Sequence, residues 1–230
     1  MIPLKDSTPS RTFPFVNWSL IIINVFVFFN EIHLNQFELS IFLNRYAIIP
    51  AKIFYEIFTP GQFSLSTLTP FLTSMFLHGG IGHIIGNMWF LYIFGDNVED
   101  KMGHLRYLIF YLLSGIIASV VHCLLYANST IPALGASGAI SGVMAAYMFL
   151  FPGSKIITFV PIIFILPLLI EVPAFIFIGL WFIGQLLSGT ITLFNGMATG
   201  IAFWAHIGGF LGGLFIYKYF LKKRKIIYII

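Results

Sequence analysis

Long apolar runs separated by polar segments dominate the hydrophobic pattern of the chain. Runs of about 20 apolar residues are typical of helices that cross a membrane. The pattern predicts six such helices, at residues 16–31, 81–94, 104–126, 137–151, 172–187 and 204–221. The sequence therefore predicts an all-α, polytopic membrane protein in which residues 1–230 form a single domain.

Two connections between the predicted spans stand out. The apolar stretch 156–170 contains Pro161 and Pro167. Two prolines would break a straight membrane helix, because each removes a backbone donor and clashes with the preceding turn. We therefore expect this stretch to run along the membrane interface. The first outer loop, residues 32–80, is long, and loops of that length are usually structured or functional.

The composition also indicates a membrane-embedded class. Hydrophobic residues make up 59% of the 230 residues and charged residues 9%. A soluble domain has about 25% charged residues, and so few charges cannot cover the surface of a soluble core. We expect the lipid bilayer as a partner, and no nucleic acid. The one cysteine, Cys123, cannot form an internal disulfide and is interpreted as a packing residue.

The distribution of Lys and Arg predicts the orientation in the membrane. With the N-terminus inside, only Arg45 and Lys52 fall in outer segments. The inner segments hold Lys5, Arg11, Lys101, Arg106, Lys155, Lys218, Lys222, Lys223, Arg224 and Lys225. Residues 1–13 and the basic tail 222–230 are thus predicted to be cytoplasmic. The abundance of Ile, Phe and Lys suits an AT-rich prokaryotic genome, so we expect the plasma membrane of a prokaryote.

Polar side chains inside a membrane are costly and are candidates for function. His83 and Asn87 fall near the outer end of the second predicted span. Ser137 opens the fourth span, and His206 lies near the outer end of the sixth. The fourth span, at about 1.5 Å per residue, measures roughly 22 Å, which is less than a hydrocarbon core of about 30 Å. We therefore expect Ser137 at the floor of a water-filled cavity open to the outer face.

Ser137 and His206 have the chemistry of a nucleophile and its general base, provided that their helices touch. Rows of small residues let membrane helices approach closely. Such rows are Gly138 and Gly142 on the fourth span and Ala205, Gly209 and Gly213 on the sixth, with Gly208 and Gly212 beside the latter. Because no acidic residue is predicted at the depth of His206, we expect a dyad whose imidazole is oriented by packing.

The groups around Ser137 suit a developing oxyanion. The first N–H groups of a helix lack internal partners and lie at the positive end of the helix dipole. His83 and Asn87 are four residues apart, so they share one helix face and can donate toward the same point. Space for a substrate backbone is expected at Gly135, Ala136 and Gly138.

At these residues the chain resembles the rhomboid family of intramembrane serine proteases. The matching segments are His78-Gly79-Gly80 with His83-x-x-x-Asn87, then Gly135-Ala136-Ser137-Gly138, then Ala205-His206-Ile207-Gly208-Gly209-Phe210-x-Gly212-Gly213. The resemblance covers about residues 13–220 and implies a six-helix bundle with a long first outer loop. It implies that Ser137 is the nucleophile and His206 the base. It also implies an oxyanion site made of the Ser137 N–H, His83 and Asn87.

The resemblance further implies a substrate and a route to the site. The substrates would be membrane proteins cleaved near the outer end of a transmembrane helix, without a metal or cofactor. Access would be lateral, past the fifth span. Phe177, Trp181, Phe182 and Gln185 would border this gate, with Trp204 beside the substrate. One departure is that the first outer loop has Asn44-Arg45-Tyr46 where some bacterial members carry a Trp-Arg pair.

Several alternatives compete with this interpretation. Ser141, one turn after Ser137, could be the nucleophile but would lie roughly 6 Å deeper. The histidines at 78, 83 and 206 could hold a metal, although the sequence lacks a His-Glu-x-x-His pair. The protein could bind membrane clients without cutting them, or it could be a transporter, which would predict inverted repeats. The sequence does not indicate an oligomeric state.

Overall fold

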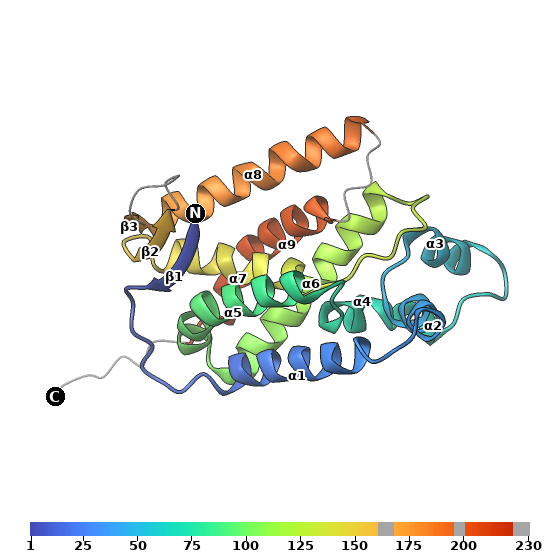
Figure 1. The fold of residues 1–230 in the computed structure, drawn as a ribbon, viewed down its shortest axis with the longest axis horizontal. Coiled ribbons are helices and arrows are strands. Elements are labelled where there is room, and N and C mark those ends of the chain that lie inside the picture. The colour runs from blue at the N-terminus through green and yellow to red at the C-terminus, as the bar shows by residue number, and fades with distance from the viewer. Residues whose placement is uncertain (161–167, 196–200, 223–230) are drawn as a thin grey trace.

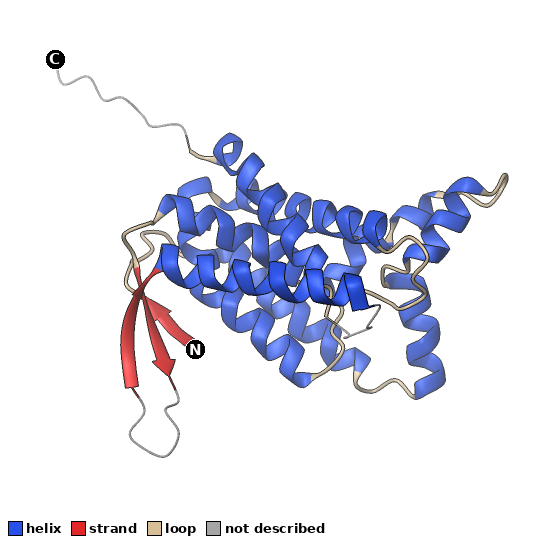
Figure 2. Ribbon diagram, turned by 90° about the horizontal axis from the view of Figure 1, so that it is seen from above, coloured by secondary structure: helices blue, strands red, loops and turns tan. Residues whose placement is uncertain are grey.

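A computed structural model describes residues 1–160, 168–195 and 201–222. Most of these residues lie in helices that pack side by side, with a small sheet at one end of the bundle (Figures 1 and 2). The longer helices are α1 (Phe15–Glu31), α5 (Ile81–Met102), α6 (His104–Leu125), α7 (Ser137–Leu150), α8 (Ala174–Asn195) and α9 (Phe203–Ile216). The connection between α1 and α5 contains α2 (Gln36–Tyr46), α3 (Pro50–Phe58) and α4 (Pro70–Thr73).

The longer helices fall on the predicted spans, with shifted ends. The second span was predicted to end at residue 94, but α5 continues to Met102. The fifth was predicted over 172–187, but α8 runs from Ala174 to Asn195. Among the described helices, α6 and α8 are long and apolar enough to cross a membrane, and α1 and α7 are shorter apolar helices. The number of spans therefore stays a prediction.

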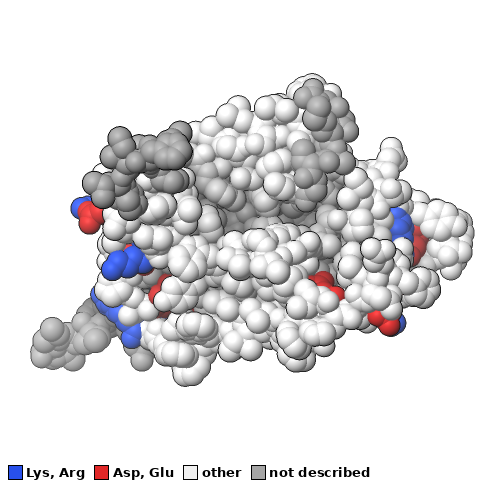
Figure 3. All heavy atoms as spheres, in the orientation of Figure 1, with Lys and Arg blue, Asp and Glu red and all other residues white. Residues whose placement is uncertain are grey.

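The surface has the polarity expected of a protein surrounded by lipid. In Figure 3 the charged side chains gather toward the two ends of the molecule, and the broad middle of this face is nearly free of them. Large exposed apolar areas on a protein mark an interaction surface. The exposed apolar residues include Ile22, Phe26 and Phe29 of α1, Leu105 and Leu124 of α6, and Phe175, Leu180, Ile183 and Leu187 of α8.

A three-stranded antiparallel sheet is the main departure from the predicted all-α fold. β2 (Lys155–Val160) pairs on one side with β1 (Ile2–Asp6) and on the other with β3 (Leu168–Pro173). The strands over the described parts of 156–170 were not predicted, although β-branched residues in this stretch favour strands. That the connection lies at the membrane interface stays a prediction. Pro161 and Pro167, on which that prediction rested, lie outside the described residues.

The first strand is fixed to the helices through Asp6. One oxygen of its carboxyl, Oδ2, accepts a hydrogen bond of 2.5 Å from the hydroxyl of Tyr147 on α7 and one of 2.9 Å from Nδ2 of Asn97 on α5. Burial raises the pKa of the Asp6 carboxyl, and the hydrogen bond from Tyr147 opposes that rise. The sheet thus closes the end of the bundle opposite α2 and α3 (Figure 1).

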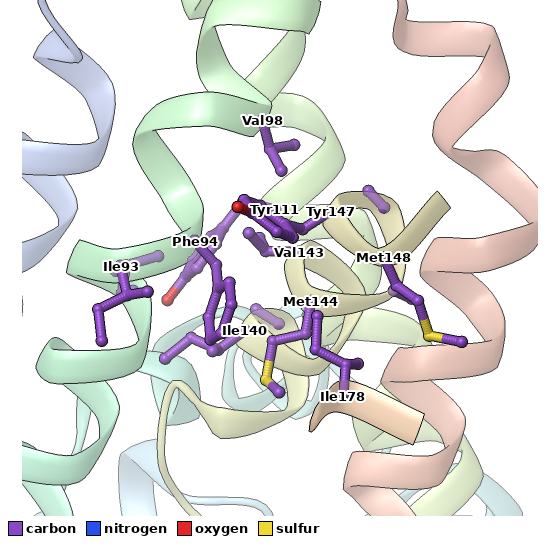
Figure 4. Packing of buried hydrophobic residues seen from close by; sticks show 14 of the residues in the cluster. Ile93, Phe94, Val98, Tyr111, Ile140, Val143, Met144, Tyr147, Met148 and Ile178 are labelled. Carbon is purple, nitrogen blue, oxygen red and sulfur yellow. The ribbon is translucent and has the colours of Figure 1, made fainter. Parts of the chain in front are cut away.

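Helix α7 is the centre of the bundle. Every residue from Gly138 to Met148 is buried, and the helix packs against α5, α6, α8 and α9. The side chains that meet here are Val143, Met144 and Tyr147 of α7, Phe94 of α5, Tyr111 of α6 and Ile178 of α8 (Figure 4). The start of α7, where Ser137 lies, is therefore fixed relative to four neighbouring helices.

The backbones of α7 and α9 approach each other so closely that only glycine fits. A Cβ built on Gly209 would lie 2.0 Å from the carbonyl oxygen of Gly138. A Cβ on Gly213 would lie 2.4 Å from Cα of Gly142. Real Cβ atoms do not come this close to backbone atoms, so a larger residue would push the helices apart. The predicted contact between the two glycine rows is confirmed.

The other two glycines of α9 serve a different neighbour. A Cβ on Gly208 would lie 2.6 Å from Cβ of Val121, and one on Gly212 would lie 2.7 Å from Cγ2 of Ile117. Val121 and Ile117 belong to α6. Two adjacent glycine stripes therefore let α9 fit into the angle between α6 and α7.

The start of α1 is held by a buried carboxylate from another helix. Pro14 precedes α1 and provides no side-chain cap. Glu99 of α5 instead accepts hydrogen bonds from the backbone N–H of Val16 (3.0 Å) and of Asn17 (2.7 Å). These N–H groups have no partner within the helix, and a negative charge is favourable at a helix N-terminus. Glu99 therefore joins α1 to α5.

We expect Glu99→Gln to lower the free energy of unfolding by about 1–3 kcal/mol, because at least one buried N–H group loses its acceptor. Thermal unfolding of the purified protein in detergent would measure the change. Asp100→Asn is the matched control, since its side chain accepts from Thr12 at an exposed position; we expect a change within about 0.5 kcal/mol. Equal effects of the two substitutions would contradict the role of Glu99.

Candidate active site

Ser137 and His206 are in direct hydrogen-bond contact. Ser137 is the first residue of α7, His206 lies in the first turn of α9, and Oγ of the serine is 2.7 Å from Nε2 of the histidine. Both side chains are half-buried. A serine hydroxyl beside an imidazole nitrogen can be deprotonated as it attacks a carbonyl carbon. The structure thus brings together the two residues predicted to form the dyad.

The second nitrogen of the His206 ring has a partner on α8. Nδ1 of His206 lies 2.7 Å from Oε1 of Gln185. We expected packing alone to orient this ring, and in this respect the prediction was incomplete. The sequence did contain a signal, because Gln185 is the one amide side chain within the apolar run 174–187, and polar side chains in such runs are candidates for function.

The backbone leading to Ser137 is held by the first outer loop. The N–H of Gly135 donates to the carbonyl oxygen of Ser74 at 2.8 Å. Ile48 and Ala133 form a two-way backbone bridge, with N–O distances of 3.0 and 2.7 Å. The loop between α1 and α5 therefore positions the segment that carries Ser137. This gives the long loop a structural role.

His83 and Asn87 face the chain just before Ser137. A Cβ built on Gly135 would lie 2.7 Å from Nε2 of His83 and 3.5 Å from Nδ2 of Asn87. Gly135 also has φ of 122°, a conformation that side chains disfavour. Glycine is therefore required at this position for two reasons. The two predicted oxyanion donors therefore lie against Gly135, the residue two positions before Ser137.

His78 holds the Asn87 side chain, which the sequence did not predict. Nδ2 of Asn87 lies 2.9 Å from Nε2 of His78, and the backbone N–H of His78 donates to Oε2 of Glu31 at 3.1 Å. An amide nitrogen carries two hydrogens. One of them can therefore be directed to His78, which leaves the other for a ligand.

The alternative nucleophile, Ser141, is occupied elsewhere. Its side chain is fully buried, and its hydroxyl donates to the carbonyl oxygen of Ser137 at 2.6 Å. This is a hydrogen bond within one helix turn, and it directs the hydroxyl along α7. Ser137 is therefore the serine of α7 that contacts an imidazole.

Most of the predicted gate residues lie where α8 meets α9. The Phe182 ring stacks on Phe210 with centroids 4.2 Å apart, and the Trp181 ring lies 6.1 Å from that of His206. Nε1 of Trp204 donates to the carbonyl oxygen of Gly189 at 3.0 Å. Phe177 is buried and lies near Phe94 of α5. Whether these residues border a gate stays a prediction.

A cavity of about 30 Å³ lies directly behind Ser137. Its volume is enough for at least one water molecule. Its polar lining includes Ser74, Ser119, His122 and Ser137. Within residues 1–160, 168–195 and 201–222, no three His, Cys, Asp or Glu side chains lie close enough to hold a metal ion. The groups around Ser137 are thus suited to hydrogen bonding and proton transfer.

Comparison with known proteins gives one family. A family model described as a Rhomboid domain matches residues 65–223. "Presenilin-associated rhomboid-like protein, mitochondrial" of Homo sapiens is 30% identical over 171 residues, which cover 70% of this chain and 40% of that protein. "RHOMBOID-like protein 6, mitochondrial" of Arabidopsis thaliana is 39% identical over 77 residues, or 34% of this chain and 24% of that protein. The chain thus spans less than half the length of these relatives.

We expect Gly209→Ala to reduce the reaction of Ser137 with a fluorophosphonate roughly 10²-fold. The added methyl group would collide with the Gly138 carbonyl and displace α9, and a shift of about 1 Å in a catalytic group can have an effect of that size. The rate of covalent labelling of the purified protein is the measurement. Gly179→Ala is the control, because a Cβ there meets no atom within 4 Å. Equal labelling rates for the two variants would contradict the role of the glycine contact.

Proposed function

The chain belongs to the rhomboid family, and on that premise we propose that it is an intramembrane serine endopeptidase. It would hydrolyse peptide bonds in or near the transmembrane segments of membrane proteins. The observation that carries this proposal is the 2.7 Å contact between Oγ of Ser137 and Nε2 of His206. A dyad of this kind performs acyl transfer without a metal or cofactor, and none is proposed.

The reaction would proceed in two stages. Nε2 of His206 accepts the hydroxyl proton as Oγ of Ser137 attacks the carbonyl carbon of the substrate. The resulting imidazolium then gives this proton to the amine of the leaving peptide, and the other peptide stays bound to the serine as an ester. In the second stage a water molecule loses its proton to His206 and attacks the ester. The acid product leaves and Ser137 recovers its proton.

The negative charge that develops on the substrate oxygen needs donors in fixed positions. The backbone N–H of Ser137 is available because it lies at the start of α7. His83 and Asn87 lie against Gly135, next to this N–H group along the chain. The hydrogen bond between His78 and Asn87 supports the role proposed for Asn87, because it fixes the amide before a substrate arrives.

The proposed topology has six spans, formed by α1 and α5 to α9. Members of this family are integral membrane proteins with several spans. The positions of Lys and Arg support a topology in which both termini of this chain would be cytoplasmic. The dyad would then open to the outer face. The two relatives named above are mitochondrial proteins by name, so the plasma membrane of a prokaryote is a prediction that rests on composition alone.

The proposed substrate is a transmembrane protein that reaches the dyad from the lipid. Lateral entry beside α8 is supported by the exposed apolar side chains of this helix, by the half-buried Trp181 next to His206, and by the half-buried Phe182 stacked on Phe210. A single transmembrane helix could approach such a surface without leaving the bilayer. Polar groups of the dyad would meet the substrate only where its helix unwinds, because a helical backbone has no free carbonyl groups in its middle.

We expect wild-type protein to be labelled by a fluorophosphonate and to cleave a transmembrane substrate in proteoliposomes. Ser137→Ala and His206→Ala should each abolish cleavage while the thermal unfolding temperature stays near that of wild type. Ser141→Ala is the control and should keep both reactions, because its hydroxyl bonds within α7. Failure of the wild type to react with the probe or to cleave would favour a protein that binds membrane clients without cutting them.

Asn87→Ala should lower kcat by roughly 10²–10³-fold with little change in KM, because an oxyanion donor acts mainly in the transition state. Steady-state cleavage in detergent separates the two constants. Asn30→Ala is a suitable control, since that amide is exposed and donates to Phe26 of its own helix. A rise in KM with unchanged kcat would assign Asn87 to substrate positioning instead.

A further inference from the structure

His206 lies between two polar partners on two different helices. Its Nε2 faces the hydroxyl of Ser137 on α7, and its Nδ1 faces Oε1 of Gln185 on α8, each at 2.7 Å. We propose that Gln185 is a positioning residue that fixes the tautomer and orientation of His206 and makes the dyad depend on the packing of α8. This inference rests on the proposed function.

The chemistry of the three groups requires one arrangement of protons. An amide oxygen only accepts hydrogen bonds, so the Nδ1 facing Oε1 must carry the hydrogen. A neutral imidazole has one hydrogen, and Nε2 is then left as the acceptor for the Ser137 hydroxyl. The ring is therefore held in the form that can act as a base. Without an acceptor at Nδ1, the hydrogen could reside on Nε2, and such a ring cannot take the serine proton.

Packing alone cannot fix which nitrogen of the His206 ring carries the hydrogen. The Trp181 ring is 6.1 Å from the His206 ring and tilted by 34°, so it restricts the plane of the imidazole. A ring flipped by 180° about its Cβ–Cγ bond would lie in the same plane and make the same apolar contact. A hydrogen-bond partner is needed to distinguish the nitrogen edge from the carbon edge and one tautomer from the other. The Ser137 hydroxyl can donate or accept, so Oε1 of Gln185 is the partner that fixes the tautomer.

An amide also suits the surroundings better than a carboxylate. Gln185 is half-buried within an apolar helix, where an ionised side chain would be costly. A neutral acceptor orients the ring without that cost. It gives less stabilisation to the imidazolium formed during the reaction, so a carboxylate at this position should change the pH dependence of the enzyme.

Because Gln185 lies on α8, its hydrogen bond to His206 also links the dyad to the packing of α8. The first turns of α8 are fixed, since the N–H of Ala174 donates to Ser154 at 2.8 Å and Ile178 is fully buried. Between residues 180 and 188 no side chain of α8 is fully buried. Two contacts to α9 flank Gln185, the Phe182–Phe210 stack and the Trp204–Gly189 hydrogen bond.

A movement of this part of α8 away from α9 would separate Oε1 of Gln185 from Nδ1 of His206. The base would then lose its fixed tautomer while the serine stayed in place on α7. The dyad is therefore complete only when α8 is packed against α9. A substrate that displaces α8 on entry would have to let it return before the chemical step.

The test compares wild type, Gln185→Leu, Gln185→Glu and Thr190→Val across a range of pH in the cleavage assay. Leu has a similar size but no acceptor, and Glu restores an acceptor with a negative charge. Thr190 is exposed and bonds within α8, so Thr190→Val is the matched control and should behave as wild type. The readouts are kcat, KM, the pH–rate profile and the thermal unfolding temperature.

We expect Gln185→Leu to lower kcat about tenfold or more with KM within about twofold of wild type, because the effect falls on proton transfer. Gln185→Glu should keep most of the activity at neutral and higher pH. Its acidic limb should move to higher pH, because a carboxylate stabilises the imidazolium. A residue that served only packing would give the opposite order, with Leu tolerated and Glu damaging.

Wild-type kcat in Gln185→Leu, or an acidic limb that does not move in Gln185→Glu, would overturn the inference. If Gln185→Leu fails to fold, the pH profile of Gln185→Glu decides alone. A different result would reject the proposed function: wild-type protein that neither cleaves the substrate nor reacts with the fluorophosphonate. An active wild type, an inactive Ser137→Ala and a fully active Gln185→Leu would reject only the role of Gln185.

Discussion

The close contact between α7 and α9 is the constraint on which the candidate site depends. Ser137 opens one helix and His206 lies in the first turn of the other, and neither helix alone can place the two side chains together. Backbone meets backbone at Gly138 and Gly209, and lipid offers no hydrophobic drive for such packing. The contact must therefore be made by van der Waals packing, which small residues permit. The chemistry of the site is, in this sense, a product of helix packing.

The other residues of the candidate site come from other elements of the bundle. α5 supplies His83 and Asn87, α8 supplies Gln185, and the first outer loop fixes the chain before Ser137. Asn87, Gln185 and the chain before Ser137 are each held by a hydrogen bond, to His78, His206 and Ser74 respectively. Two acidic side chains accept backbone N–H groups: Glu99 at the start of α1, and Glu31 at His78, beside the site.

The sequence predicted the helices, the glycine contact and the pairing of Ser137 with His206, because apolar runs and small-residue rows are local patterns. It missed the contacts of Gln185 and His78, which depend on side-chain directions that spacing does not give. It also missed the sheet. β1 and β2 are about 150 residues apart, and no local pattern in residues 2–6 indicates the strand with which they pair. The two prolines argued against a helix over 156–170 but did not predict the strands at 156–160 and 168–170.

The pairing of Ile2 with Phe159 has a consequence for biogenesis. A ribosome adds roughly 5–20 residues per second, so the first strand waits on the order of 8 to 30 seconds before its neighbour is synthesised. In the proposed topology, α1, α5, α6 and α7 would enter the bilayer during this time. Both strands would end on the same side of the membrane only if an even number of these helices had crossed it, so the sheet could close only after correct insertion.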